Sequence, residues 1–359
     1  MVTYGFPCPG PAVLRSAFNF CHHLALDGEK AWRPLLAVHY LTYACAFRCP
    51  YCSDGAQNPY YTLREPPLDA SRALELLRGI RAHCEHLVLT GGEPLTHPEL
   101  GAILEGLPGL GFAGVVFTTN GHGLQPHLPA LARCVTELVV SVDTLDAAKA
   151  DAWFGRGPGV LVEVVASLDA ALAMPGRRFE VVISAVVTPG NLDDLMEVYR
   201  WSQARGCRFA ACPQLEGIKA HPALAEDPRY RAFYDLLLRD KRGGANIQGT
   251  VPYLTQMRDL SRFRCRPSAL LVVSPQGHVF HPCLERGQFA GNLLEEPDLH
   301  ALRKAGRARF GPQPDCGTCC HSACALGFAS LLAHPWSLVP ETWRQARVRF
   351  KGCGRTMRA

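Results

Sequence analysis

Six short apolar runs, each followed by a longer segment with helical spacing, recur through residues 35–212. Apolar runs of about four to eight residues predict buried strands, whereas apolar residues three and four positions apart predict helices. The expected strands are residues 35–40, 86–90, 114–121 (with its exit loop), 137–143, 179–187 and 207–212. Strands that alternate with helices form a parallel sheet, and six such units are too few to close a barrel of eight. The pattern therefore predicts an α/β fold, built as a partial, open (β/α)6 barrel of the TIM type.

Four helices are expected between these strands, and two of them begin at residues that are typical helix caps. They occupy residues 69–82, 98–107, 160–174 and 191–206. Asp69 and Asn191 are the expected N-caps, because their side chains can accept hydrogen bonds from first-turn amides. Before the first strand, residues 11–27 predict an amphipathic helix, so we expect an N-terminal helical extension over residues 1–34.

Three cysteines follow the first expected strand directly. The stretch 41–52 reads LTYACAFRCPYC and places Cys45, Cys49 and Cys52 on the loop at the carboxyl end of that strand. Three thiolates can bind three irons of a four-iron cluster and leave the fourth iron without a protein ligand, which resembles an open catalytic coordination position. A partial zinc site and a chance grouping are the alternatives.

The composition favours metal or redox chemistry for the cysteines. The chain has 359 residues, 16 cysteines and a net charge of +5, and its Lys and Arg residues are dispersed. The start of the chain lacks the features of a signal peptide, and no apolar run approaches the length of a membrane span. We therefore expect a cytoplasmic protein that binds neither nucleic acid nor a membrane, and a disulfide framework is not expected in that reducing compartment.

A second motif stands one strand later and changes the picture. The stretch LVLTGGEPLTHPEL follows an apolar run and contains Gly91, Gly92, Glu93 and Pro94. Together with the CxxxCxxC stretch and the aromatic Tyr51 before its last cysteine, it resembles the signature of the radical S-adenosylmethionine (SAM) superfamily. The resemblance covers residues 35–212 well. Alone, the GGEP sequence would be an ordinary turn at a strand exit.

The resemblance implies the cofactors and the chemistry. A [4Fe–4S] cluster held by the three cysteines would take one electron from a reductant such as flavodoxin or ferredoxin. SAM bound at the open iron would then be cleaved to methionine and a 5′-deoxyadenosyl radical, which abstracts a hydrogen atom from a substrate. The cofactors carry the difficult chemistry, and the protein positions and shields them.

The resemblance also assigns roles to the two motifs. Tyr51 would lie beside the adenine of SAM. Gly91 and Gly92 would let the backbone approach the methionine part closely, because no Cβ intervenes. Glu93, which Pro94 follows, would pair with the SAM ammonium group.

Four further polar residues stand at or after the ends of the third and fourth expected strands. Ser141 resembles a family residue that contacts SAM. Arg156 resembles an arginine that pairs with the SAM carboxylate, although it stands a few residues further along than the family pattern. Asn120 is another candidate for SAM binding, and Asn120 and Asp143 could equally be turn formers that bond their own backbone.

A second cysteine region follows a helical linker that we place at residues 213–262. Cys265 precedes an apolar strand and a turn, and Cys283 ends the returning strand. Five more cysteines follow them: Cys316, Cys319, Cys320, Cys324 and Cys353. Residues 263–359 thereby resemble the SPASM and twitch auxiliary-cluster domains of the superfamily.

The expected number of auxiliary clusters depends on the adjacent pair Cys319 and Cys320. Neighbouring residues rarely face the same cluster, so we predict one auxiliary [4Fe–4S] cluster. Its expected ligands are Cys265, Cys283, Cys316 and Cys319. The alternatives are two clusters that recruit Cys320, Cys324 and Cys353, and a structural zinc site.

Two other groups near the expected site could take part in chemistry. Glu285 is a candidate proton acceptor near the substrate, although an exposed loop carboxylate is the simpler interpretation. Cys212 ends the sixth expected strand and faces the expected site.

The predicted function is that of a radical SAM enzyme. Oxidation or crosslinking of a peptide is the commonest implication of such a C-terminal domain, followed by dehydrogenation of a small molecule, and epimerisation is a further option. The alternatives are a non-catalytic iron–sulfur electron carrier or scaffold, and a zinc-stapled binding module. A carrier has no need for a SAM pocket, so Glu93 and the Gly-Gly turn favour the enzyme.

Overall fold

The computed structural model describes residues 11–25, 31–52, 58–59, 62–63, 65–311 and 320–341. Its centre is a curved nine-stranded sheet in the order β11-β10-β9-β1-β2-β3-β4-β5-β6. The six barrel strands are β1 Leu36–Thr42, β2 His86–Gly91, β3 Gly114–Thr119, β4 Glu137–Ser141, β5 Glu180–Val187 and β6 Arg208–Pro213. Each of them pairs in parallel with the next one in the chain. The predicted partial barrel is confirmed.

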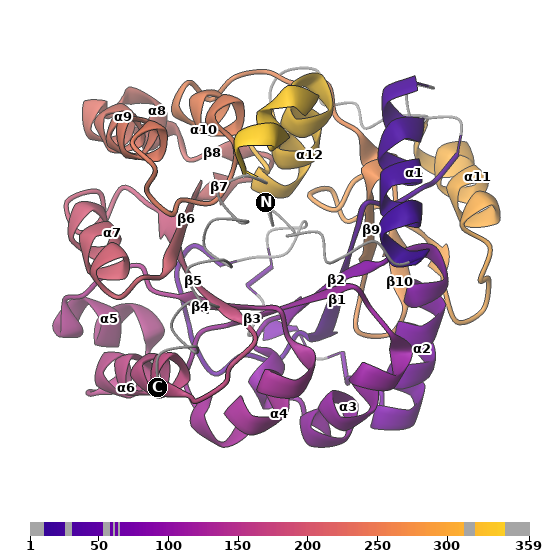
Figure 1. The fold of residues 1–359 in the computed structure, drawn as a ribbon, viewed down its shortest axis with the longest axis horizontal. Coiled ribbons are helices and arrows are strands. Elements are labelled where there is room, and N and C mark those ends of the chain that lie inside the picture. The colour runs from indigo at the N-terminus through magenta and orange to yellow at the C-terminus, as the bar shows by residue number, and fades with distance from the viewer. Residues whose placement is uncertain are drawn as a thin grey trace, which may run out of the picture.

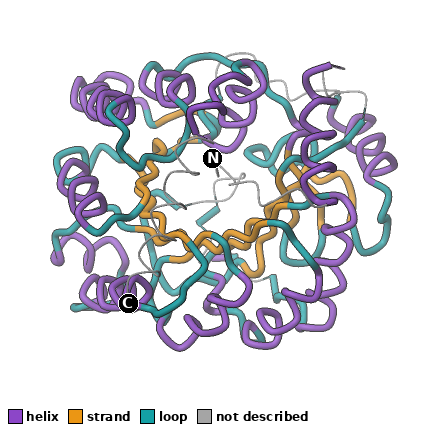
Figure 2. The backbone as a smooth tube through the Cα atoms, in the orientation of Figure 1, coloured by secondary structure: helices purple, strands orange, loops and turns teal. Residues whose placement is uncertain are grey.

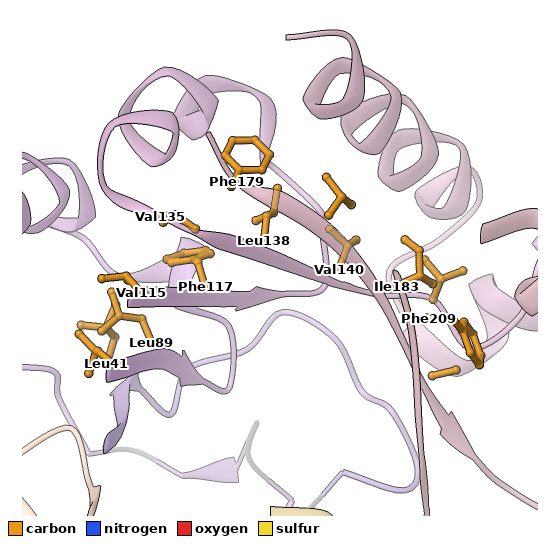
Figure 3. Close-up of a cluster of buried hydrophobic side chains, with 14 of the residues drawn as sticks. Leu41, Leu89, Val115, Phe117, Val135, Leu138, Val140, Phe179, Ile183 and Phe209 are labelled. Carbon is orange, nitrogen blue, oxygen red and sulfur yellow. The ribbon is translucent and has the colours of Figure 1, made fainter. Parts of the chain in front are cut away.

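The helices between these strands cover the outer face of the sheet, as Figures 1 and 2 show. They are α2 Ala70–His83, α3 Leu100–Gly106, α4 Leu128–Cys134, α5 Ala147–Phe154, α6 Val160–Ala173 and α7 Leu195–Ala204. The predicted cap Asp69 is confirmed, since its side chain accepts a hydrogen bond from Arg72 N in the first turn of α2. Figure 3 shows part of the buried apolar layer, in which Phe117, Leu138 and Ile183 lie on neighbouring strands.

The predicted cap Asn191 is wrong. Helix α7 begins at Leu195 with Asp194 as its N-cap residue. The Asn191 side chain is buried instead, and its Nδ2 donates to the carbonyls of Asp143 (3.0 Å) and Val186 (2.8 Å) at the ends of β4 and β5. Buried carbonyl groups need hydrogen-bond donors, and the Asn191 side chain supplies them here instead of capping the helix.

The C-terminal hairpin extends the barrel sheet. Strands β9 Leu270–Val273, β10 His278–Phe280 and β11 Phe289–Asn292 are joined by antiparallel pairing. Strand β9 also pairs in parallel with β1, with Leu36 opposite Leu270 and His39 opposite Val273. The hairpin between Cys265 and Cys283 is therefore joined to β1, the strand that the first cysteine loop follows.

The segment expected to be a helical linker contains a small hairpin as well as helices. Its elements are β7 Leu215–Glu216, β8 Lys219–Ala220, α8 Pro222–Glu226, α9 Pro228–Arg242 and α10 Val251–Arg258. The hairpin follows β6 directly at the carboxyl end of the barrel.

Helix α12 (Ala323–Ala333) spans the open side of the barrel (Figure 1). It packs against α10 at one end of the opening and against α1 (Pro11–Ala25) at the other. On the β1 side Phe328 and Leu332 join a separate buried cluster with Leu36 and Ala269. Helix α11 (Leu299–Phe310) packs on β11.

A buried ion pair fixes the segment that follows α12. Lys241 Nζ, on α9, donates to Glu341 Oε2 (2.8 Å) and to the Ile247 carbonyl (2.7 Å). The Lys241 side chain is 2% exposed, so these acceptors replace the water that its charge would otherwise need.

Among the described helices, none is by itself long and apolar enough to cross a membrane. One bent pair, Ala323–Ala333 with Pro335–Glu341, reaches that length and composition across a 104° bend.

Three strands are tied together at the amino end of the barrel by Arg208 on β6. Its Nη1 donates to Glu137 Oε1 on β4 (3.1 Å) and to Gln248 Oε1 (3.2 Å). Its Nη2 donates to Glu180 Oε2 on β5. Burial raises the pKa of Glu137 to about 7, and the neighbouring guanidinium opposes this rise. The carboxylate therefore depends on Arg208 to remain charged inside the protein.

We expect Arg208→Ala to lower the free energy of unfolding by about 3 to 5 kcal/mol, because it leaves Glu137 buried without its cation. The matched control is Arg205→Ala, which removes a pair with Asp169 at the surface, where Arg205 is partly exposed, and should cost less than about 1 kcal/mol. Urea unfolding followed by circular dichroism measures both. Equal losses in the two variants would contradict the role given to Arg208.

Candidate active site

The cysteine loop lies at the carboxyl ends of the barrel strands, directly after β1. Cys45, Cys49 and Cys52 are all partly buried. The loop is held by its own backbone: Cys52 N donates to the Cys49 carbonyl (3.2 Å), and Phe47 N lies 3.4 Å from Cys45 Sγ. Asn120 Nδ2, at the exit of β3, lies 4.0 Å from the same sulfur. Amide donors at these distances favour negative charge on the sulfur.

The residues between the first two cysteines anchor the loop to helix α5. The Phe47 ring stacks on Phe154, with 4.4 Å between the ring centroids. Arg48 N donates to the Phe154 carbonyl (2.9 Å). The Arg48 guanidinium donates to the carbonyls of Cys45, Ala46 and Phe47 at 3.1 to 3.2 Å. Sequence reasoning missed these contacts, because a spacing rule for ligands says nothing about the residues between them.

The Gly-Gly turn after β2 packs its backbone onto the backbone of the cysteine loop. Gly92 N donates to the Thr42 carbonyl and Glu93 N to the Ala44 carbonyl, both at 2.8 Å. A Cβ on Gly92 would lie 2.3 Å from the Tyr43 carbonyl oxygen, and one on Gly91 would lie 2.2 Å from that of Thr42. Gly91 also has φ +151°, which L side chains rarely adopt. The close backbone packing thus requires glycine at both positions, whether or not SAM binds there.

Glu93 is 2% exposed and links the exits of β2 and β3. Its Oε1 accepts from Leu95 N (3.0 Å) and Thr119 Oγ1 (2.8 Å), and its Oε2 accepts from Asn120 N (2.6 Å). Burial raises the pKa of Glu93 to about 7, and these three donors oppose the rise. Pro94, which follows, is buried at the start of a short 3-10 helix, Pro94–Thr96.

Tyr51 and Asp143 are bonded to each other across the barrel mouth. The Tyr51 hydroxyl donates to Asp143 Oδ2, and Asp143 Oδ1 accepts from Val186 N (2.7 Å). Burial raises the pKa of Asp143 to about 6. The Tyr51 ring meets Trp153 edge-on, 6.0 Å between centroids. Asp143 was expected either at the site or as a turn former for its own backbone, and it binds Tyr51 and the exit of β5.

The other two predicted SAM contacts are Ser141 and Arg156, and they differ in how far they are buried. Ser141 is partly buried at the last position of β4, paired in register with Ser184. Arg156 is exposed, and its Nη2 lies 3.3 Å from His122 Nε2. The other nitrogen of that ring lies 2.8 Å from Glu163 Oε2. Arg156 therefore lies over the exit of β3, at His122, which is two residues after Asn120.

A pocket of about 280 Å³ adjoins the cysteine loop. One wall is the loop itself, with Tyr51 and Cys52, and the opposite wall is the β7–β8 hairpin. The lining residues are Pro50, Tyr51, Cys52, Pro59, Gln214, Leu215, Glu216 and His221. A small organic group could lie there directly beside the third cysteine.

The C-terminal cysteines are described only in part. Cys265 and Cys283 are partly buried, whereas Cys316, Cys319 and Cys353 lie outside the described residues. Cys320 Sγ accepts a hydrogen bond from Ser322 N at 3.4 Å, as Cys45 does from Phe47 N. The choice of Cys316 and Cys319 as ligands therefore stays a prediction.

Glu285 is partly buried rather than exposed on its loop, and Ser322 hydrogen-bonds to its side chain. The simpler interpretation given for this residue is therefore wrong. Burial raises the pKa of Cys212 to about 12, with Cys324, Asp143 and Glu285 as the nearby acidic groups. The end of β6 thus faces both the barrel mouth and the C-terminal segment.

The donor set of the cysteine loop fits an iron–sulfur cluster. Burial, together with the nearby thiols and Asp143, raises the pKa of Cys49 and of Cys52 to about 12. Thiolates at these positions therefore need positive charge beside them, as bound iron supplies. Among the described residues no three His, Cys, Asp or Glu side chains converge enough to share a single ion. Three thiolates bound to three different irons need not converge in that way.

Comparison with known proteins identifies the domain. The model of the radical SAM superfamily matches residues 40–202, which contain the cysteine loop, the GGEP turn and strands β2 to β5. Residues 40–202 are a radical SAM domain. The cofactors of this domain are therefore a [4Fe–4S] cluster and SAM. Three thiol ligands and an open iron account for this pairing.

The curated proteins that match the radical SAM domain include several GTP 3′,8-cyclases. A probable GTP 3′,8-cyclase of Archaeoglobus fulgidus is 31% identical over 162 residues, which are 44% of this chain and 52% of the relative. GTP 3′,8-cyclase 1 of Pseudomonas aeruginosa is 32% identical over 185 residues, which are 50% of this chain and 54% of the relative. The chain spans about half the length of the curated relatives it matches.

Solved structures share the fold over a larger part of the chain. SuiB of Streptococcus suis, bound to its precursor peptide SuiA, has a TM-score of 0.55 at 18% identity and covers 78% of this chain and 66% of its own. The anSMEcpe protein with bound AdoMet has a TM-score of 0.60 at 14% identity and covers 85% and 98%. At these identities the likeness shows the fold alone.

We expect Gly92→Ala to disrupt the radical SAM site, because its Cβ would press against two carbonyl oxygens of the cysteine loop, at 2.3 and 2.6 Å. Iron bound after anaerobic reconstitution should fall by about four atoms per chain, the content of one [4Fe–4S] cluster. The free energy of unfolding should fall by about 1 to 3 kcal/mol.

Gly101→Ala is the matched control. A Cβ there meets no atom within 4 Å, and the position lies in helix α3, where alanine is favoured by roughly 0.5 to 1 kcal/mol. A Gly92→Ala protein with full iron content would contradict the packing role of the turn.

Proposed function

We propose that this chain is a radical SAM enzyme that cleaves SAM reductively at a cluster held by Cys45, Cys49 and Cys52. The observation that carries the proposal is the fixed loop of three partly buried thiols at the carboxyl ends of the barrel strands. When bound, the cluster supplies one electron to SAM, and cleavage to methionine leaves a 5′-deoxyadenosyl radical that removes a hydrogen atom from the substrate. The residues of the chain position these groups and exclude water from them.

The pocket beside Cys52 is our proposed place for the adenosine part of SAM. Tyr51 forms one wall, which supports its expected position beside the adenine. Gln214 offers an amide that can donate to and accept from a base edge. The pocket joins the cysteine loop to the β7–β8 hairpin, so SAM bound there would lie between the ends of β1 and β6, the first and last strands of the parallel barrel.

The methionine part of SAM would lie toward the exits of β2, β3 and β4. Glu93 accepts three hydrogen bonds from described residues, and a carboxylate has about four acceptor positions, so one could take an ammonium hydrogen. Asn120 and Ser141 lie at neighbouring strand ends and could serve the same group. Arg156 would have to leave His122 to reach the SAM carboxylate.

The substrate is proposed to be a peptide side chain rather than a nucleoside triphosphate. The described residues whose charges act on Cys212 at the barrel mouth are acidic: Asp143, Glu285 and Cys324. A triphosphate would be repelled there, whereas a neutral or cationic peptide would not. The fold neighbours that extend into the C-terminal part were solved with peptides, SuiA for SuiB and Cp18Cys for anSMEcpe.

The outcome we favour is oxidation or crosslinking of that peptide, which removes one hydrogen atom, one further electron and one proton from it, with Glu285 as the candidate proton acceptor. An auxiliary [4Fe–4S] cluster in residues 263–359 is the proposed acceptor of that electron, with Cys265 and Cys283 among its ligands. Dehydrogenation of a small molecule would need the same removal of a hydrogen atom and the same electron acceptor. A flavodoxin or ferredoxin in a reducing cytoplasm is the proposed source of the first electron.

We expect the reconstituted protein, given dithionite and SAM under anaerobic conditions, to release 5′-deoxyadenosine. The triple variant C45A/C49A/C52A should release at least about a hundredfold less, because no open iron remains to bind SAM. Chromatography of the quenched reaction and iron analysis measure both effects.

A triple variant of cysteines away from the loop is the matched control. Cys21 lies on α1, Cys134 ends α4, and Cys207 precedes β6 at the amino end of the barrel. C21A/C134A/C207A should keep its iron and its 5′-deoxyadenosine. An iron-loaded wild-type protein that releases none would overturn the enzymatic function and favour an electron carrier.

A further inference from the structure

His321 is bonded on every side, although no step of the proposed reaction uses it. Its backbone N donates to the Ile218 carbonyl (2.8 Å), and its Nδ1 accepts from Ala220 N (2.8 Å). Its Nε2 lies 3.1 Å from the Leu260 carbonyl. An amide nitrogen can only donate, so Nδ1 carries no hydrogen, and the hydrogen on Nε2 is donated to Leu260. The ring is thus held as one neutral tautomer.

Two of these bonds hold the hairpin that forms the pocket wall. Ile218 and Ala220 belong to the β7–β8 hairpin, whose strands have two residues each. So short a hairpin is not stable by itself and needs contacts from outside. The same hairpin supplies Leu215 and Glu216 to the pocket that contains Tyr51 and Cys52.

The third bond holds the end of α10. Leu260 has φ +44° and is the one residue other than glycine with positive φ among the described parts of the chain. Such a conformation is costly for leucine and persists where the surroundings impose it. Its carbonyl accepts the hydrogen bond from His321, which is one of the contacts that impose it.

His321 lies within the second cysteine region, so its contacts connect that region to the hairpin and to α10. Cys320 precedes it directly, and Ser322, which follows, donates to Cys320 Sγ and hydrogen-bonds to Glu285. Helix α12 begins at the next residue, Ala323. One imidazole therefore ties the C-terminal cysteine segment to the wall of the pocket beside Cys52.

We propose that His321 is a positioning residue that sets the pocket wall for SAM without touching SAM. The proposal rests on the proposed function in one respect, namely that SAM occupies this pocket. The C-terminal segment would thereby control SAM affinity at the barrel. Removing the ring takes away the bond to Ala220 N and leaves the hairpin only the backbone bond from His321 N to Ile218. The hairpin can then move away from Cys52, and SAM loses contacts on that side.

The two ring nitrogens can be separated by substitution. The amide oxygen of Asn lies near the position of Nδ1 and can accept from Ala220 N, whereas the amide nitrogen of Gln lies near that of Nε2 and can donate to Leu260. His321→Asn should therefore preserve the hairpin bond, His321→Gln should preserve only the Leu260 bond, and His321→Ala should remove both. The matched control is His300→Ala, an exposed histidine on α11.

The experiment measures the dissociation constant of SAM by calorimetry on the reconstituted, unreduced protein, in which SAM is not cleaved. We expect His321→Ala and His321→Gln to weaken SAM binding about three- to tenfold, the effect of one or two lost hydrogen bonds. His321→Asn should stay within about twofold of wild type, as should His300→Ala. Iron content should be unchanged in all of them.

A second readout separates this proposal from the proposed function. The Ala220 amide, followed by hydrogen–deuterium exchange, should exchange at least about tenfold faster in His321→Ala and at the wild-type rate in His321→Asn. Wild-type exchange and wild-type SAM affinity in His321→Ala would overturn the proposal, and so would tighter binding by His321→Gln than by His321→Asn. A wild-type protein that binds no SAM would overturn the SAM pocket, while the exchange result would still decide whether His321 holds the hairpin.

Discussion

The contact between two strand exits, made backbone to backbone, is the constraint on which the rest of the site depends. The turn after β2 lies on the loop after β1 through the bonds from Gly92 N to Thr42 and from Glu93 N to Ala44. Any side chain on either glycine would meet a carbonyl oxygen at less than 3 Å. Through this contact, Glu93 also fixes Asn120, whose side-chain amide lies 4.0 Å from Cys45 Sγ. The geometry of the cysteines is thus set by neighbouring strands as well as by their own loop.

Two buried carboxyl groups, Glu93 and Asp143, lie at the described mouth of the barrel. Burial raises the pKa values of Asp143 and Glu93, so both carboxyl groups are charged only while donors or cations remain beside them. Tyr51, Val186 and Asn120 provide donors in the structure. Iron and the sulfonium and ammonium groups of SAM are cations of the kind that such a site accommodates. The electrostatics of the site and the assigned cofactors therefore agree.

The fold and the position of the cysteine loop could be predicted because their signals are local. Each barrel strand is an apolar run, parallel order follows from the intervening helices, and the three cysteines adjoin the first run. The pairing of β9 with β1 could not be predicted, since residues 36 and 270 carry no local sign of each other. The stacking of Phe47 on Phe154 and the burial of Glu285 are equally non-local. Asn191 misled because its side chain serves the ends of β4 and β5, where helix-cap rules do not apply.

The buried pair of Lys241 and Glu341 has a consequence for how this protein can be shortened. A version that ends before Glu341 would deprive an enclosed ammonium group of the carboxylate 2.8 Å away, at the point where the far end of the chain is attached to α9. Loss of one partner of an enclosed pair costs far more than loss of a surface pair. A chain cut just after α12 would therefore hold this helix less firmly over the open side of the barrel. Every cysteine of the first motif would still be present in it.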